Sequence, residues 1–100
     1  KAAIRIDHDR GAVLDVAVNL GRLASVLARG GRAGVAARIL SSSDALTEGI
    51  GASVPWWAGR RNEETRAIIR TKLDEATFAE AGEQGRALTV DEAVALAIDS

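Results

Sequence analysis

The chain has 100 residues, with 13 lysines and arginines against 14 aspartates and glutamates, which leaves a formal net charge of −1. This length allows one domain rather than two. The near-neutral charge argues against a nucleic-acid-binding surface, which needs a basic patch. Because there is no cysteine, disulfides and thiolate metal sites are excluded.

Hydrophobic residues make up 47 % of the chain, but only 3 % of it is aromatic, so aliphatic side chains suited to helix–helix contact must form the core. No apolar run approaches the roughly 20 residues that a membrane-spanning helix needs. The first residues also lack the apolar segment of a signal peptide. We therefore expect a cytoplasmic protein that binds no membrane. Because the chain contains no methionine, we expect it to be a fragment of a longer protein.

The first predicted helix covers residues 9–28. Its apolar side chains recur at steps of three and four, which places them on one helical face: Val13, Val16, Leu20, Leu23 and Leu27. Asp7 or Asp9 can cap its start by accepting hydrogen bonds from free backbone N–H groups. Gly30-Gly31 stops the helix, because glycine adopts the left-handed conformation at low steric cost.

A second helix is predicted over residues 32–48, with an apolar side formed by Val35, Ala36, Ile39, Leu40 and Leu46. Ser41-Ser42-Ser43 lie inside it at some cost in helix propensity. We interpret these small side chains as room for the approach of another helix. Because the connection between the two helices is only a few residues long, they should be antiparallel neighbours.

Residues 49–59 are predicted as a loop that holds Pro55 and the pair Trp56-Trp57. Helices are then expected over residues 60–73 and 75–83, the second ended by Gly85. Residues 89–92 have the T-x-x-E form of a capping box and should start the last helix. Its inner face is predicted to contain Val90, Ala93, Val94, Ala97 and Ile98. No segment alternates with period two, so no sheet is expected.

The first two helices have the spacing of a tetratricopeptide repeat, W-x2-L-G-x2-Y followed by A-x3-F. The corresponding residues are Leu20-x2-Leu23-Ala24-x2-Leu27, Gly31 at the turn, and Ala36-x3-Leu40, with leucines in place of both aromatics. Any antiparallel hairpin of two amphipathic helices would satisfy much of the same pattern, so both interpretations remain open at this point.

A longer similarity covers residues 36–40, 44–46, 50–52 and 78–94, and the run G-R-A-L-T-V-D-E-A-V at 85–94 is its most specific part. These segments resemble the C-terminal tetratricopeptide-like region of actinobacterial LuxR-type, ATPase-containing transcriptional regulators and their adenylate-cyclase-linked relatives. The resemblance implies a nucleotide-binding module upstream and often a helix-turn-helix beyond this region. This chain contains no G-x-x-x-x-G-K-[ST] phosphate loop. It departs from the family at Trp56-Trp57, where prolines are commoner.

Five residues are candidates for binding a partner: Trp56, Trp57, Arg60, Arg66 and Arg70. Tryptophan is enriched among the residues that dominate binding energy. A structural interpretation is preferred, however, because the tryptophans lie between Pro55 and Gly59 in a segment that should not continue a helix. At least one ring should therefore fold back over the helix ends. The arginines could dock an acidic partner or form a solvated face balanced by neighbouring glutamates.

No catalytic, cofactor or metal site is expected. His8 is the only histidine, and polarity at a helix start explains its place between Asp7 and Asp9 better than a metal site does. The carboxylates of the second half lie among small residues without an evident pocket: Asp74, Glu75, Glu80 and Glu83. No histidine lies near the serine run in sequence.

These observations predict an all-α domain over residues 1–100, with a tetratricopeptide-like hairpin (9–48), a loop (49–59) and capping helices (60–99). The expected function is a non-catalytic scaffold for protein–protein interaction or signal transmission within a bacterial transcriptional regulator. Its partner would be another protein, a neighbouring domain or a small effector. An exposed apolar stripe would favour a homodimer. The alternative is a DNA-binding helix-turn-helix near residues 75–99, which the acidic content there disfavours.

Overall fold

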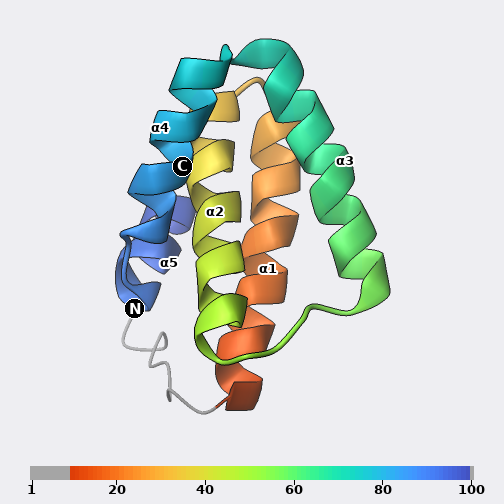
Figure 1. Ribbon diagram of the computed structural model, residues 1–100, viewed down its shortest axis with the longest axis vertical. Coiled ribbons are helices and arrows are strands. Elements are labelled where there is room, and N and C mark those ends of the chain that lie inside the picture. The colour runs from red at the N-terminus through yellow and green to blue at the C-terminus, as the bar shows by residue number, and fades with distance from the viewer. Residues whose placement is uncertain (1–9, 100) are drawn as a thin grey trace.

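The computed structural model describes residues 10–99, which form five α-helices (Figure 1). Within this described part there is no strand, so the predicted all-α fold of about five helices is confirmed. The helices are α1 (Arg10–Arg29), α2 (Ala33–Gly49), α3 (Trp56–Lys72), α4 (Glu75–Arg86) and α5 (Val90–Asp99).

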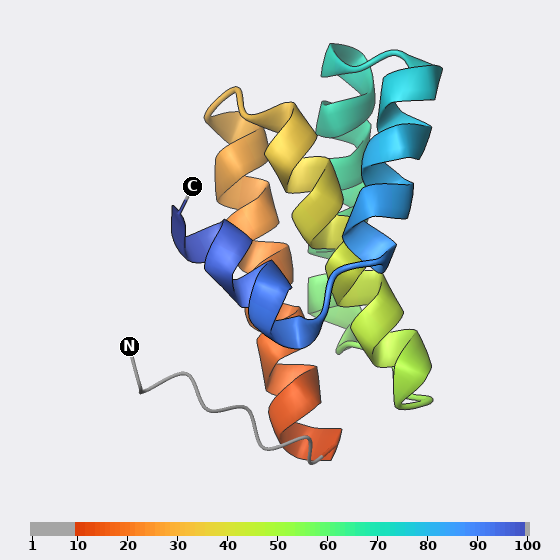
Figure 2. The same ribbon diagram turned by 90° about the vertical axis from the view of Figure 1, so that its left-hand side faces the viewer.

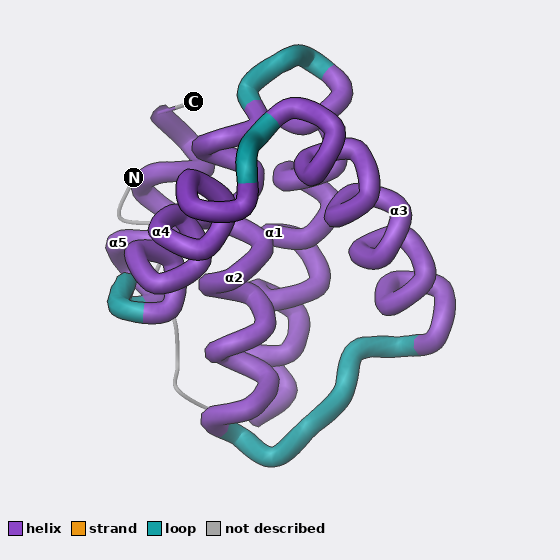
Figure 3. The backbone as a smooth tube through the Cα atoms, turned by 45° about the horizontal axis from the view of Figure 1, so that its top comes forward, coloured by secondary structure: helices purple, strands orange, loops and turns teal. Residues whose placement is uncertain are grey.

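An antiparallel hairpin of α1 and α2 forms the centre of the molecule, and the other three helices pack around it (Figure 1). Although α3 and α4 are consecutive, α3 lies beside α1 at one edge and α4 beside α2 at the other. α5 contacts both helices of the hairpin and crosses them at an angle (Figure 2). The longest connection, residues 50–55, leads from α2 to the start of α3 (Figure 3).

A glycine in the left-handed conformation ends each helix of the hairpin. Gly31, with a φ of +86°, follows α1, and the N–H of Arg32 donates to the carbonyl of Leu27 across 2.8 Å, as in a Schellman motif. Gly51, with a φ of +63°, follows α2 in the same way. The predicted stop after α1 is therefore confirmed, and it explains how so short a turn reverses the chain.

Small side chains set the distance between α1 and α2. The hydroxyl of Ser43, in α2, donates to the backbone carbonyl of Ala17, in α1, across 2.8 Å. Such a bond requires the two backbones to approach closely, so the serine run provides the room predicted for another helix. Residues from both helices are fully enclosed at 0 % exposure: Ala17, Ala24, Ala28, Ala36 and Ile39.

The inner face of α1 differs from the prediction in its centre. Val13 and Leu20 are buried, but Val16, Leu23 and Leu27 are only partly buried at the margin of the core. The alanines of α1 occupy the line of closest contact, where larger side chains would hold the helices apart. The spacing of apolar residues predicts the correct side of the helix. It assigns the centre of that side to bulky residues, whereas alanines occupy it.

α4 continues to Arg86, past the predicted end at Glu83, and Gly85 does not terminate it. Gly85 is buried in the last turn, where a Cβ atom would lie 2.1 Å from the carbonyl oxygen of Arg38 in α2. Its function is therefore close helix contact. The sequence prediction was wrong here because glycine is common both at helix ends and at helix crossings.

α3 begins at Trp56, four residues before the predicted start at Arg60. Pro55 precedes the first turn, and its carbonyl accepts hydrogen bonds from the N–H groups of Ala58 and Gly59 at 2.9 and 3.0 Å. A proline at the start of a helix breaks no backbone hydrogen bond, because the N–H group that it lacks would have no partner within the helix. Its φ angle is also close to the helical value. The predicted loop 49–59 is thus shortened, and Gly59 lies inside the helix.

The predicted capping box of α5 is present. The N–H of Thr89 donates to Glu92 Oε1 across 2.8 Å, and the N–H of Glu92 donates to Thr89 Oγ1 across 3.1 Å. Ala93 and Ala97 form the buried face of this helix. Ile98, which was predicted on the inner face, is 46 % exposed because it lies at the edge of the contact with α1.

The expectation that no segment could span a membrane needs correction. Gly11–Arg29, with 19 residues, is long and apolar enough to cross a bilayer by length and composition. Both criteria are also met by the core helix of a soluble bundle. Here 39 % of the window is buried inside the fold, and the segment is the helix that α2, α3 and α5 all contact.

Two glycines of α4 provide a matched test of the contact between α4 and α2. Gly85→Ala should destabilise the protein by about 3 kcal/mol or more, because its Cβ would meet backbone atoms that cannot move aside. Gly82→Ala is the control, since its Cβ would lie 3.5 Å from Ser41 Oγ, an ordinary contact. It should raise stability by about 0.5–1 kcal/mol. Urea unfolding measures both, and equal effects would contradict the packing described.

Candidate functional site

The two tryptophans lie together on the surface, in the first turn of α3. Trp56 is 78 % exposed and Trp57 is 49 % exposed. The prediction that a ring folds back over the helix ends is therefore wrong. Its premise, that Pro55 and Gly59 exclude a helix, fails because the helix begins directly after Pro55 and directs both rings outward.

Arg61 lies one turn beyond Trp57, with its guanidinium carbon 5.7 Å from the centre of the indole ring. Its Nη2 also donates to the carbonyl of Val18, in α1, across 2.9 Å. The guanidinium is therefore held between two helices and beside an exposed aromatic ring, as in a cation–π contact. Sequence analysis did not select Arg61 for the site, although its i, i+4 spacing from Trp57 was visible.

A glycine of α1 makes room for this arrangement. A Cβ on Gly21 would lie 2.7 Å from Arg61 Nη2 and 2.6 Å from Asn62 Oδ1. Both atoms are at the ends of side chains, so a larger residue at position 21 would displace them from α1. Gly21 thus leaves the space against α1 in which the guanidinium of Arg61 lies.

A second arginine, Arg22 of α1, acts on the same guanidinium. Burial lowers the pKa of Arg61, and the positive charge of Arg22 lowers it further. Among residues 10–99, no carboxylate lies within ion-pair distance of either side chain. We call Trp56, Trp57, Arg60, Arg61 and Arg22 the tryptophan–arginine surface.

The three predicted arginines of α3 have different surroundings. Arg60 has a side chain that is 76 % exposed, at 4.0 Å from Glu64, so it remains available at the surface. Arg66 forms ion pairs with Asp44 of α2 and with Glu63, and therefore joins α3 to the hairpin. Arg70 lies at the other end of α3, away from the tryptophans.

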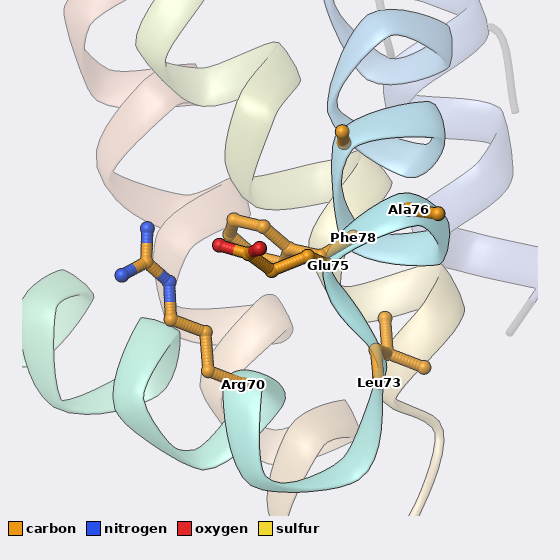
Figure 4. A pocket seen from close by; sticks show the side chains of 6 residues that line it. Arg70, Leu73, Glu75, Ala76 and Phe78 are labelled. Atoms are coloured by element: carbon orange, nitrogen blue, oxygen red, sulfur yellow. The ribbon is translucent and has the colours of Figure 1, made fainter.

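Arg70 lines a recess of about 470 Å³ at the elbow between α3 and α4 (Figure 4). Its guanidinium carbon lies 5.0 Å from the centre of the Phe78 ring. Glu75 points toward the same space from α4 (Figure 4). An arginine and a glutamate beside one aromatic ring could hold an amphipathic group, but they provide no nucleophile with an adjacent base.

Asp74 caps α4 at this elbow. The N–H of Thr77 donates to Asp74 Oδ1 across 2.7 Å, and this bond holds the pKa of the Asp74 carboxyl below its ordinary value. The other carboxylates predicted as a group are not gathered into one site: Glu75 lines the elbow recess, whereas Glu80 lines a separate recess between α2 and α4.

An apolar groove of about 190 Å³ lies between α1 and α5. It is lined by Val16, Asn19, Leu20, Leu23, Val94, Ala97 and Ile98. The α1 stripe on which the homodimer prediction rested is therefore partly covered by α5 rather than left open. A stable interface buries about 800 Å² on each partner, so this groove would need to be extended by neighbouring surface. The homodimer stays a prediction.

Metal binding was not expected, and the described part of the chain, residues 10–99, contains no group of three or more His, Cys, Asp or Glu side chains that could hold an ion. The predicted helix caps Asp7 and Asp9, with His8 between them, lie outside the described residues.

No protein-family model, curated protein or solved structure matches this chain. The tetratricopeptide and LuxR-type regulator resemblances therefore stay predictions from the sequence.

The cap of α4 gives a pH-dependent prediction. Because folding lowers its pKa, ionised Asp74 stabilises the protein above the unfolded value of about 3.9, and the contribution is lost as the pH falls through the lower folded value. Asp74→Ala should therefore lower the Tm at pH 7, and the difference should shrink in acid. Asp74→Asn keeps a cap acceptor that does not titrate and should retain more of the Tm. Identical Tm values for wild type and Asp74→Ala at pH 7 would exclude this function of the cap.

The exposure of the indoles can be measured separately, because the chain has only these two tryptophans. Trp57→Phe leaves Trp56 as the sole reporter, and Trp56→Phe leaves Trp57. Acrylamide should quench Trp56 more steeply, because it is 78 % exposed against 49 % for Trp57, which Arg61 partly shields. Strong protection of Trp56 would mean that its ring lies against the helices after all.

Proposed function

We propose that this chain is a non-catalytic helical scaffold that binds a protein partner through the tryptophan–arginine surface. The observation that carries the proposal is the exposure of both tryptophans on one helical turn. Tryptophan is usually well buried, and exposed aromatic residues beside arginine are typical of protein-binding sites. The surface is also rigid, since it lies on a helix that Arg66 and Arg61 join to the hairpin.

The wider setting follows from the sequence resemblance. We propose that the scaffold acts in the cytoplasm within a bacterial transcriptional regulator, where it transmits or receives a signal by binding another protein or a neighbouring domain. Enzymatic activity is not proposed, because none of the three recesses described above combines a nucleophile, a base and a buried polar pocket.

The DNA-binding alternative has one favourable feature: α4 and α5 are joined by only residues 87–89, a spacing compatible with a helix-turn-helix. Its charge is unfavourable. Residues 75–99 contain six acidic residues and a single base, which gives 1 − 6 = −5. That base, Arg86, is paired with Glu48, which raises the pKa of the guanidinium. Tight, salt-sensitive binding in a gel shift with nonspecific DNA would favour this alternative.

The proposed function can be tested by selecting peptides from a random display library on the immobilised full chain. Selected peptides should lose at least about tenfold in affinity for Trp56→Ser/Trp57→Ser, because truncating central aromatic residues costs the most binding energy. The matched control is Val26→Ser/Ile98→Ser, which removes exposed apolar side chains elsewhere on the surface, where the native residues are 63 % and 46 % exposed. Circular dichroism confirms that both double variants fold.

Failure to select any peptide, or selection of peptides that bind the tryptophan double variant as tightly as the wild type, would contradict the proposal. Loss of binding in the Val26→Ser/Ile98→Ser control would instead place the contact on the exposed surface of α1 and α5 that carries these two residues.

A further inference from the structure

The tryptophan–arginine surface also indicates the chemistry of the partner, an inference that rests on the proposed function. Arg61 is the central group. Its single hydrogen bond within residues 10–99 runs from Nη2 to Val18, and its Nε is enclosed without a partner. A guanidinium has five N–H donors, so the remaining capacity lies on the terminal nitrogens. These match a carboxylate in geometry and charge.

Among residues 10–99, neither Arg61 nor Arg22 forms an ion pair with a carboxylate. Arg22 acts on Arg61 from α1, whereas Arg60, one residue earlier on α3, is exposed and lies 4.0 Å from Glu64. Arginine remains protonated at all physiological pH values, so Arg61 and Arg22 are two like charges without a carboxylate partner, and Arg61 lies beside the exposed ring of Trp57. A carboxylate placed between Arg22 and Arg61 would replace repulsion with attraction.

The position of Arg61 is fixed before any partner arrives. The space that holds its guanidinium exists because position 21 is glycine, and the guanidinium contacts the carbonyl of Val18 and the ring of Trp57. A binding group that is already ordered loses less conformational freedom on association than a free surface arginine does. The arrangement is therefore that of a preformed anion-binding site beside an apolar surface.

We infer that the tryptophan–arginine surface binds an acidic protein segment that also carries an aliphatic or aromatic residue. A carboxylate of the segment is bound by Arg61 and Arg22, and the apolar side chain packs on Trp56 and Trp57. An anionic membrane offers similar groups, but Glu63 and Glu64 are exposed on the same helix and would face the lipid headgroups. Repulsion between these carboxylates and the headgroups disfavours a broad membrane surface. A protein segment is narrow enough to bind beside Glu63 and Glu64 without contacting them.

The selected peptides provide the probe. Their sequences should be enriched in aspartate and glutamate. A selected peptide should bind at least about tenfold more tightly than its counterpart with glutamine and asparagine in place of the acidic residues, as for close interfacial charge pairs. This difference should shrink at high salt. Binding is followed by the fluorescence of Trp56 and Trp57, which lie in the site and are the only tryptophans.

Arg22→Gln tests the charge directly, because this exposed residue can be changed without disturbing the core. Affinity for the acidic peptide should fall about three- to tenfold, as for loss of one partially screened charge pair. Arg29→Gln is the matched control, with the same charge change two turns further along α1, and should bind like the wild type. Arg61→Gln should weaken binding more than Arg22→Gln.

The outcomes separate the two proposals. If selected peptides require the tryptophans but are not acidic, or bind Arg22→Gln and Arg61→Gln as tightly as the wild type, the acidic partner is excluded while the protein-binding function stands. If no peptide requires the tryptophans, both proposals fail. If vesicles containing phosphatidylserine bind the full chain in a tryptophan-dependent manner and the acidic peptide does not compete, the ligand is a membrane surface and the inference is overturned.

Discussion

Close approach of helix backbones is the constraint on which this structure depends. The alanines of α1 and the serine at position 43 bring α1 and α2 near enough for a serine hydroxyl to donate to the carbonyl of Ala17. Gly85 brings α4 close to α2 as well, next to the carbonyl of Arg38. A core built in this way gains its stability from many small contacts between well-packed side chains rather than from a few large aromatic ones.

This way of packing has a consequence for the surface. Because alanine, serine and glycine fill the helix crossings, the core has no space for an indole, and both tryptophans lie outside it. Phe78, the remaining aromatic residue, is only partly buried against the core and contacts Arg70. The large aromatic side chains that most proteins bury are therefore exposed or partly exposed here. Trp57 lies near Arg61, and Phe78 lies near Arg70.

Sequence reasoning succeeds where a pattern depends on local chain geometry. The stop at Gly31 and the capping box of Thr89 and Glu92 follow from backbone hydrogen bonds that involve only neighbouring residues. It fails at Gly85 and Pro55, because each residue type has two common functions and the neighbouring helix decides between them. Arg61 illustrates the same limit: its spacing from Trp57 is local, but its bond to Val18 joins residues 43 positions apart.

Gly21 connects the packing of the core with the proposed binding surface. A glycine in the interior of a helix costs roughly 1 kcal/mol relative to alanine, and α1 has alanine at several neighbouring positions. Room for α2 does not explain this glycine, because the atoms nearest to a Cβ at position 21 belong to Arg61 and Asn62 of α3. The glycine instead makes room for Arg61, whose Nη2 donates to the carbonyl of Val18. Since Arg61 in turn lies beside Trp57, the residue that weakens α1 is also the one that leaves room for the guanidinium next to this exposed ring.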